Sequence, residues 1–126
     1  MSFLPLRDRD YLNSKSLQYE EIDSEGQKAI RIRAWALPKG KYDSERVDVL
    51  LFLPAGYPDV QPDMFYTHPW VKLTSCGRFP RAADQAVSFA QLSWQRWSRH
   101  SSEWRAGRDG IWTMLKRIQY SIEMAE

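Results

Sequence analysis

The sequence predicts an α+β fold: a four-stranded antiparallel meander, in which consecutive strands are neighbours, packed against a C-terminal helix. Three observations indicate it. Between residues 16 and 53, apolar and polar side chains alternate in several stretches, as they do in half-buried strands. Short turn-forming sequences separate these stretches, and such short connections join antiparallel strands. Near the C-terminus the apolar spacing changes to three and four residues, as in an amphipathic helix.

The first elements are a short helix and a β-hairpin. The stretch around Pro5 mixes apolar and charged residues, and we expect at most a short helix over residues 8–13. Residues 16–23 alternate weakly, Ser24-Glu25-Gly26 is a turn signal, and residues 27–37 alternate clearly. The alternation predicts that the second strand presents one face with Ile30, Ile32, Ala34 and Ala36 and another with Arg31, Arg33 and Trp35.

The third strand is the most apolar, and prolines set its end. Residues 46–53 predict a buried central strand. Proline cannot donate a hydrogen bond to a sheet, so this strand ends at Pro54 and the next one begins after Pro62. Residues that precede a proline are kept out of the helical region, which favours a rigid turn in between. A short fourth strand over residues 64–67 then stops at His68-Pro69.

Residues 70–108 lack a clear periodicity and are rich in aromatic side chains. A connection of this length in a compact domain is usually functional or contains a short helix, and residues 82–92 could supply one. The C-terminal helix is clearer, with Asp109 as its expected cap. Its apolar stripe should pack on the apolar face of the meander and consists of Ile111, Leu115, Ile118 and Ile122.

Composition limits the class of protein. A chain of 126 residues is expected to form one domain, residues 1–126. The net charge of +2 is too small to indicate nucleic acid or an acidic membrane as the partner. With a single cysteine no internal disulfide can form, which suits a reducing cytoplasm. The N-terminus lacks an apolar signal segment and no apolar run approaches the ~20 residues of a membrane span, so we expect a cytoplasmic protein.

Three blocks that together span nearly the whole chain carry a resemblance to a known family. They are Leu4-Pro5-Leu6-Arg7-Asp8 with Tyr11-Leu12, Leu53-Pro54-Ala55-Gly56-Tyr57-Pro58-Asp59 with Pro62-Asp63-Met64-Phe65-Tyr66, and Trp94-Gln95-Arg96-Trp97-Ser98-Arg99-His100 with Trp104, Gly107 and Asp109. The sequence resembles the prokaryotic ubiquitin-conjugating-enzyme-like (UBC-like) proteins of family E. The resemblance implies a UBC-like fold whose N-terminal helix is short or missing, and it makes Gln61-Pro62 a candidate for a cis peptide bond.

The resemblance also implies a function. Members of this branch look like ubiquitin-conjugating enzymes and are expected to act with a ubiquitin-like protein, an activating enzyme and a JAB-type peptidase, without a cofactor. Antiphage defence is an analogy with other branches. The expected role is an acyl carrier that accepts the ubiquitin-like protein as an oxyester or thioester and transfers it to an amine. The alternative is a noncatalytic adaptor of the same fold, which binds the activating enzyme or the ubiquitin-like protein.

Cys76 is the first candidate nucleophile, because a thiolate attacks acyl groups readily and is also a good leaving group. In ordinary conjugating enzymes a His-Pro-Asn motif precedes the cysteine, whereas this chain has His68-Pro69-Trp70 and so lacks the amide that would donate to an oxyanion. Cys76 follows His68 by eight positions but precedes Trp104 by 28, so the two spacings disagree. The alternative is that Cys76 is an incidental loop residue.

Ser98 is the second candidate. It precedes Trp104 by about the interval at which the catalytic cysteine of conjugating enzymes precedes a tryptophan, and His100 could serve as its base. The alternative is that Ser98 and Ser101 cap a helix and that Arg99 and His100 are surface or partner contacts. His68 could be a second polar group of the site or a structural hydrogen-bonding residue.

A docking surface is predicted where basic and aromatic residues interleave, and its expected residues are Trp94, Arg96, Trp97, Arg99 and Trp104. An acidic protein partner suits this pattern, whereas stacking on single-stranded nucleic acid is disfavoured by the low net charge. The spacing of the two histidines and one cysteine offers no set of metal ligands, and we expect no metal.

Overall fold

The computed structural model describes residues 2–101 and 103–126, and over this part of the chain it is an α+β domain. Two helices flank six strands in the order α1 (Leu6–Ser14), β1 (Tyr19–Ser24), β2 (Gln27–Ala36), β3 (Arg46–Leu53), β4 (Phe65–His68), β5 (Gln85–Phe89), β6 (Leu92–Trp97) and α2 (Ile111–Met124). All strand pairs are antiparallel, and the spatial order is β1-β2-β3-β4-β6-β5. The predicted meander and C-terminal helix are confirmed.

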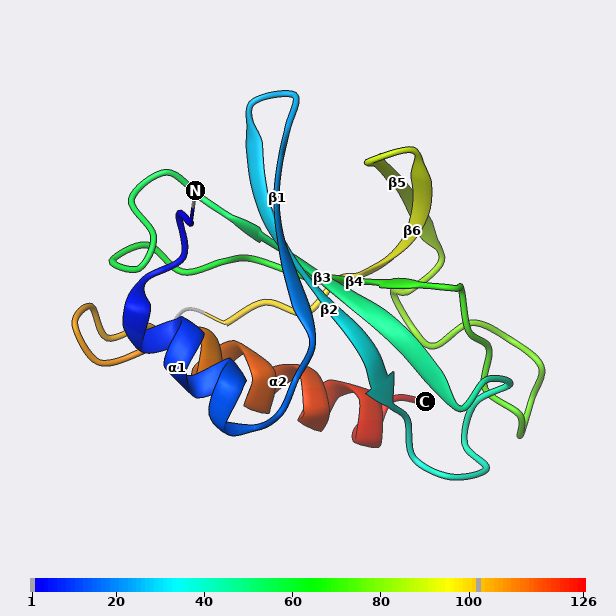
Figure 1. Ribbon diagram of the computed structural model, residues 1–126. Helices are drawn as coiled ribbons and strands as arrows, with labels where there is room; N and C mark the ends of the chain where they lie inside the picture. Colours follow the sequence, from blue (N-terminus) through cyan, green and yellow to red (C-terminus); the bar gives the residue numbers. More distant parts are fainter. Residues whose placement is uncertain (1, 102) are drawn as a thin grey trace.

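The helices lie on one face of the sheet, with α1 beside the N-terminal half of α2 (Figure 1). The main core fills the space between helices and sheet, and the predicted stripe of α2 is buried there together with Met114. A second, smaller apolar cluster lies on the opposite face of the sheet, around Leu50, Tyr66 and Trp94. Because successive side chains of a strand point to opposite faces, Trp94 belongs to the second cluster and Trp97 to the first.

The helix expected over residues 82–92 is wrong, because this stretch forms β5 and the turn that leads into β6. β6 adds to the sheet beside β4 and extends the predicted four strands to six. The turn residues Ala90 and Gln91 both have a positive φ, of 49° and 68°, as in the tight turns that match the twist of a hairpin. Such turns usually contain Asn or Gly, and their absence here removed the sequence signal.

A bulge in β2 changes the face on which Trp35 lies. The pairing of β2 with β3 shifts between Ile32 and Trp35, and Ala34 has a positive φ of 53°. A bulge inserts one residue and so moves the following side chains to the other face. Trp35 therefore packs against the main core while Ala34 is exposed, contrary to the simple alternation. Asp48 stabilises the bulge, because its Oδ1 accepts a hydrogen bond from the Ala34 N–H at 3.0 Å.

The N-terminus of α2 depends on Asp8 rather than on Asp109. Asp8 is buried, and its Oδ1 accepts from the Ile111 N–H at 3.2 Å, while its Oδ2 accepts from the Tyr57 hydroxyl at 2.6 Å. The expected cap, Asp109, instead accepts from the N–H of residue 105 and closes a turn. Between them, Gly110 has no room for a side chain, since a Cβ would lie 2.8 Å from Asp8 Oδ1. One carboxylate thus joins α1, the proline-rich turn and α2.

Two further features correct or complete the description of the backbone. The cis peptide bonds are Tyr57-Pro58 and His68-Pro69, so the cis bond expected at Gln61-Pro62 is wrong. In the described parts of the chain, neither helix has the length and apolar character that a membrane crossing requires.

Candidate functional site

The end of β4 carries His68, whose ring lies close to β6. The His68 Nδ1 is 3.3 Å from the main-chain oxygen of Ser93, and Trp70 Nε1 donates to the same oxygen at 3.1 Å. A carbonyl oxygen can only accept, so the Nδ1 of His68 carries the proton. The Trp70 that replaces the expected Asn is therefore occupied in holding β6, and it does not present a free donor at this position.

Gln95 holds the irregular segment that follows β4. Its side chain is fully buried, and its amide accepts from the Val71 N–H at 2.8 Å and donates to the carbonyls of Val71 and Ala83 at 3.0 and 2.8 Å. The hydroxyl of Thr67 also donates to Gln95, and Trp97 donates to that hydroxyl. Every polar atom of this buried amide is paired. Its bonds to Val71 and Ala83 attach the connection to the sheet at two places twelve residues apart.

Cys76 lies in an exposed turn of that connection. The turn is closed by the Leu73 N–H, which donates to the carbonyl of Arg78 at 2.8 Å, and it borders the β2–β3 loop through a bond from Thr74 to Lys41. Hydrogen bonds from the main chain and the side chain of Arg78, and then its positive charge, lower the pKa of the Cys76 thiol below its usual value. A larger thiolate fraction increases the reactivity of an exposed sulfur.

Ser98 follows β6 directly and is partly buried. Its N–H donates to the carbonyl of Ala82 at 3.0 Å, so its main chain is held against the end of the connection. The residue borders a hollow of about 400 Å³ between this strand end and the C-terminal part of α2. Arg99, Tyr120 and Ser121 line this hollow and also the neighbouring one that contains His100.

His100 forms a pair with Asp63. The Nδ1 of His100 lies 2.7 Å from Asp63 Oδ1, and the two side chains are 62% and 64% exposed. An ionised carboxylate can only accept, so Nδ1 donates and, in the neutral ring, Nε2 is left as an acceptor. The pair borders a hollow of about 420 Å³ lined by α2, β4 and residues 99–101. An imidazole oriented by a carboxylate is the arrangement of a general base.

The four candidate catalytic residues do not form one cluster. β4 and β6 run antiparallel, with Thr67 opposite Gln95 and Phe65 opposite Trp97. His68 is therefore displaced from Ser98 by about four residues, or roughly 13 Å along the strands, too far for a hydrogen bond. Ser98 and His100 border adjoining hollows at one end of β4, and His68 lies at the other end.

The expected docking surface is reduced to three residues, because Trp94 and Trp97 are both fully buried. Trp104 is partly buried, and its Nε1 donates to the carbonyl of Pro58 at 2.9 Å. Arg96 lies opposite Tyr66 and is also partly buried. These positions correct the expected docking surface: two of its three tryptophans belong to the core.

Arg99 is a partly buried cation beside the candidate nucleophile. Its guanidinium lies 5.4 Å from the centre of the Trp97 ring, and burial lowers its pKa. In the described ranges 2–101 and 103–126 no carboxylate lies within 4 Å of it. Arg99 is therefore available to an anion that enters either hollow.

Sequence reasoning missed Asp63, Ser93 and Gln95. Asp63 meets His100 across 37 positions, and no local pattern signals such a contact. Ser93 and Gln95 became visible only once β6 was paired with β4. Gln95 lies between Trp94 and Trp97 together with Arg96, so the local sequence alone does not mark Gln95 as the buried polar residue.

A sequence profile of the family described as prokaryotic E2 family E matches residues 4–125. No curated protein and no solved structure gives a significant match. The match covers nearly the entire chain, and the chain belongs to prokaryotic E2 family E. Membership supports a conjugating-enzyme-like role in general.

Proposed function

From this membership, we propose that the protein carries a ubiquitin-like protein as an ester and transfers it to an amine. An activating enzyme would supply the acyl group, and a JAB-type peptidase would act in the same cytoplasmic pathway. The observation that carries the proposal is the side-by-side position of Ser98 and the His100–Asp63 pair at the adjoining hollows below β4. It supplies a hydroxyl, an oriented imidazole and the cation of Arg99 within one surface region.

The loading step on Ser98 is an acyl transfer. The oxygen of Ser98 attacks the thioester carbon of the activating enzyme, its proton passes to Nε2 of His100, and the thiolate of the activating enzyme leaves. Asp63 stabilises the imidazolium that forms, and Arg99 donates to the developing oxyanion. In the second step the amine of the target attacks the ester carbon, and the hydroxyl of Ser98 is restored.

Cys76 is the competing nucleophile within the same proposal. Its thiolate needs no base, because hydrogen bonds from Arg78 already lower the pKa of the thiol. It is exposed, so a large acyl donor can reach it. A thioester on Cys76 would react with amines faster than an oxyester on Ser98, since the thiolate is the better leaving group.

The noncatalytic adaptor is the second candidate, and a specific observation favours it. His68, which belongs to the motif preceding the nucleophile in conjugating enzymes, is not near Ser98, and Trp70 is engaged with Ser93. A UBC-like domain that only binds its partners does not need these groups to converge.

Reconstitution distinguishes the two functions. The chain is incubated with its activating enzyme, its ubiquitin-like protein and ATP, and a covalent adduct is sought on a denaturing gel. Hydroxylamine at neutral pH should remove a thioester quickly and an oxyester slowly. Ser98→Ala should abolish the adduct if Ser98 is loaded, and Cys76→Ala should abolish it if Cys76 is loaded, while Ser88→Ala is the matched control on exposed β5.

Two results would contradict the proposal. An adduct that survives in the Ser98→Ala/Cys76→Ala double variant would show that the nucleophile is another residue. Absence of any adduct while the chain still binds the activating enzyme or the ubiquitin-like protein would favour the adaptor. Loss of activity in His100→Gln with normal unfolding behaviour would support the base, because His100 is exposed and contributes little to stability.

A further inference from the structure

A groove of about 930 Å³ lies away from Ser98 and His100, between the end of α1, the end of β2 and α2. α1 is only nine residues long and covers the N-terminal half of α2, so the C-terminal half extends beyond it (Figure 1). The apolar part of the groove is supplied by Tyr11, Leu17, Trp35 and Leu115. Nothing in the proposed carrier chemistry uses this surface.

The bulge in β2 creates the apolar floor of the groove. Without the inserted residue, Trp35 would lie on the other face of the sheet, with Arg31 and Arg33. Ala34 has a positive φ, a conformation that is unfavourable for an L-residue, so the surrounding structure must maintain it. Asp48 and Arg46 do so, because they bond the N–H and the carbonyl of Ala34 at 3.0 and 3.1 Å. Backbone strain of this kind concentrates at functional surfaces.

The rim of the groove is cationic. Lys15, Arg46 and Lys116 come from three different elements, and among the described residues no carboxylate lies within 4 Å of any of them. Arg33 also lines the groove, but Glu20 and Asp48 neutralise it. Glu123 is the one carboxylate among the described lining residues. The groove thus combines an apolar floor with uncompensated positive charge at its edges.

We propose that this groove binds an acidic protein segment, with an apolar side chain of that segment resting on Trp35 and its carboxylates facing Lys15, Arg46 and Lys116. Lys15 directly follows α1 and Lys116 lies on α2, and this separation suits charges spaced along a peptide rather than one compact anion. The apolar floor suits an apolar side chain of a protein partner. The net charge of only +2 argues against nucleic acid. The groove does not include Ser98, His100 or Asp63, although Lys116 borders both the groove and the hollow beside His100. The proposed peptide binding does not depend on the carrier chemistry.

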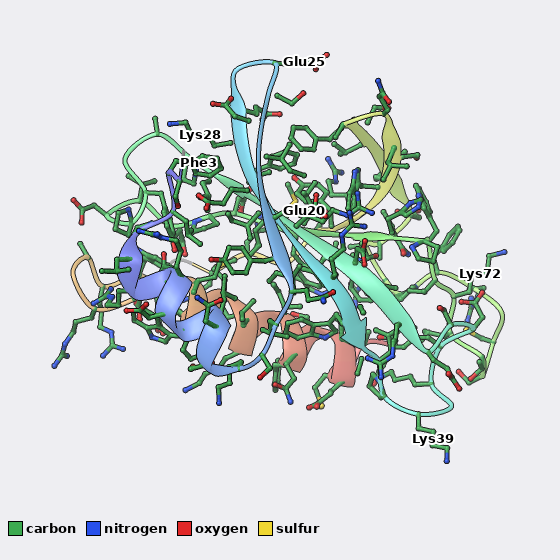
Figure 2. The ribbon with its side chains drawn as sticks, in the orientation of Figure 1. Phe3, Glu20, Glu25, Lys28, Lys39 and Lys72 are labelled. Carbon is green, nitrogen blue, oxygen red and sulfur yellow. The ribbon has the colours of Figure 1, made fainter. Side chains whose placement is uncertain are left out.

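The test uses the full chain and a short fluorescein-labelled peptide made of Glu-Glu-Leu repeats. Fluorescence anisotropy should show saturable binding that weakens as salt is added, because exposed charges are screened over about 10 Å at 0.1 M salt. Lys15→Gln/Lys116→Gln should weaken binding roughly 5-fold, since each exposed ion pair contributes little. The matched control, Lys28→Gln/Lys72→Gln, removes the same charge from exposed sites outside the groove and should change binding less than 2-fold (Figure 2).

A second measurement locates the peptide. In a two-dimensional NMR titration, the indole N–H signal of Trp35 should shift, while that of the fully buried Trp97 should not. The proposal is overturned if the peptide does not bind, or if both double variants weaken binding equally. It is also overturned if a Gln-Gln-Leu or Lys-Lys-Leu peptide binds as well as the acidic one. An oligothymidylate that displaces the labelled peptide from the Trp35 site at a lower concentration than the unlabelled acidic peptide does would likewise overturn it.

Discussion

At the scale of single residues, the buried amide of Gln95 has the largest structural consequence. Gln95→Leu keeps the approximate volume but leaves the N–H of Val71 and the carbonyls of Val71 and Ala83 without these partners. An unsatisfied buried polar group costs about 1–3 kcal/mol, so we expect the free energy of unfolding to fall by roughly 2–4 kcal/mol. Urea denaturation measures it. Gln85→Leu, on exposed β5, is the matched control and should change stability by less than about 0.5 kcal/mol.

Cys76 makes a prediction about reactivity. The pKa of its thiol lies below the usual value, so the thiolate is populated at lower pH and the rate of alkylation by iodoacetamide should reach half its maximum at lower pH than in the urea-unfolded chain. Arg78→Gln removes the side-chain hydrogen bond and the charge but keeps the main-chain bond, so it should move the profile part of the way back. Identical profiles for the folded and unfolded protein would refute the effect of Arg78.

At the scale of elements, the strained bulge of β2 can be relieved. Ala34 has a φ of 53°, which glycine adopts without steric cost, so Ala34→Gly should raise the free energy of unfolding by about 0.5–1 kcal/mol. Ala36 lies two residues further along and is also exposed, but it is not among the residues with positive φ. Ala36→Gly should therefore lower stability by about 0.5–1 kcal/mol. Thermal unfolding of both variants measures the contrast, and two changes of the same sign would contradict it.

The same element shows why sequence reasoning succeeded in some places and failed in others. The strand at residues 46–53 and the buried stripe of α2 were predictable because their periodicity is uninterrupted. β2 follows its pattern up to Ile32 and loses it at the bulge, since one extra residue leaves no mark on composition. The β5–β6 hairpin was missed because Ala90 and Gln91 occupy turn positions that Asn and Gly normally fill.

The candidate site was predictable only in part, for a related reason. The composition of residues 94–104 indicated a segment with chemistry, and Ser98 and His100 do border the hollows of α2. Which of its side chains face outward depends on the pairing of β6 with β4, so the burial of Trp94 and Trp97 could not be read from the segment itself. Contacts between distant positions, such as His100 with Asp63, require the sheet order.

At the scale of the whole molecule, two tyrosines in the connections that flank β3, the buried Tyr42 and the partly buried Tyr57, hold the two helices. Tyr57 donates to Asp8, and Tyr42, before β3, donates to the carbonyl of Ile122 near the end of α2 at 2.5 Å. Burial raises the pKa of both hydroxyls, and for Tyr57 the hydrogen bond to Asp8 adds to the effect. Ionisation of either hydroxyl would place a negative charge inside the domain and remove its hydrogen bond.

Stability should therefore fall on the alkaline side. Tyr42 has a pKa of about 12 in the folded protein, against about 10 in an unfolded chain. Because this pKa is raised on folding, the protonated Tyr42 hydroxyl makes its full contribution to the free energy of unfolding below pH ~10. That contribution, on the order of 2–3 kcal/mol, is lost as the pH rises toward the folded pKa. Urea midpoints between pH 8 and pH 11 should show this decline.

Tyr42→Phe should be less stable at pH 8 by about 1 kcal/mol, because it has lost the bond to Ile122, but its stability should decline less steeply with pH. Tyr120→Phe, at an exposed position of α2, is the control and should keep the wild-type slope. Equal slopes for wild type and Tyr42→Phe would show that ionisation of the Tyr42 hydroxyl does not cause the loss of stability at alkaline pH.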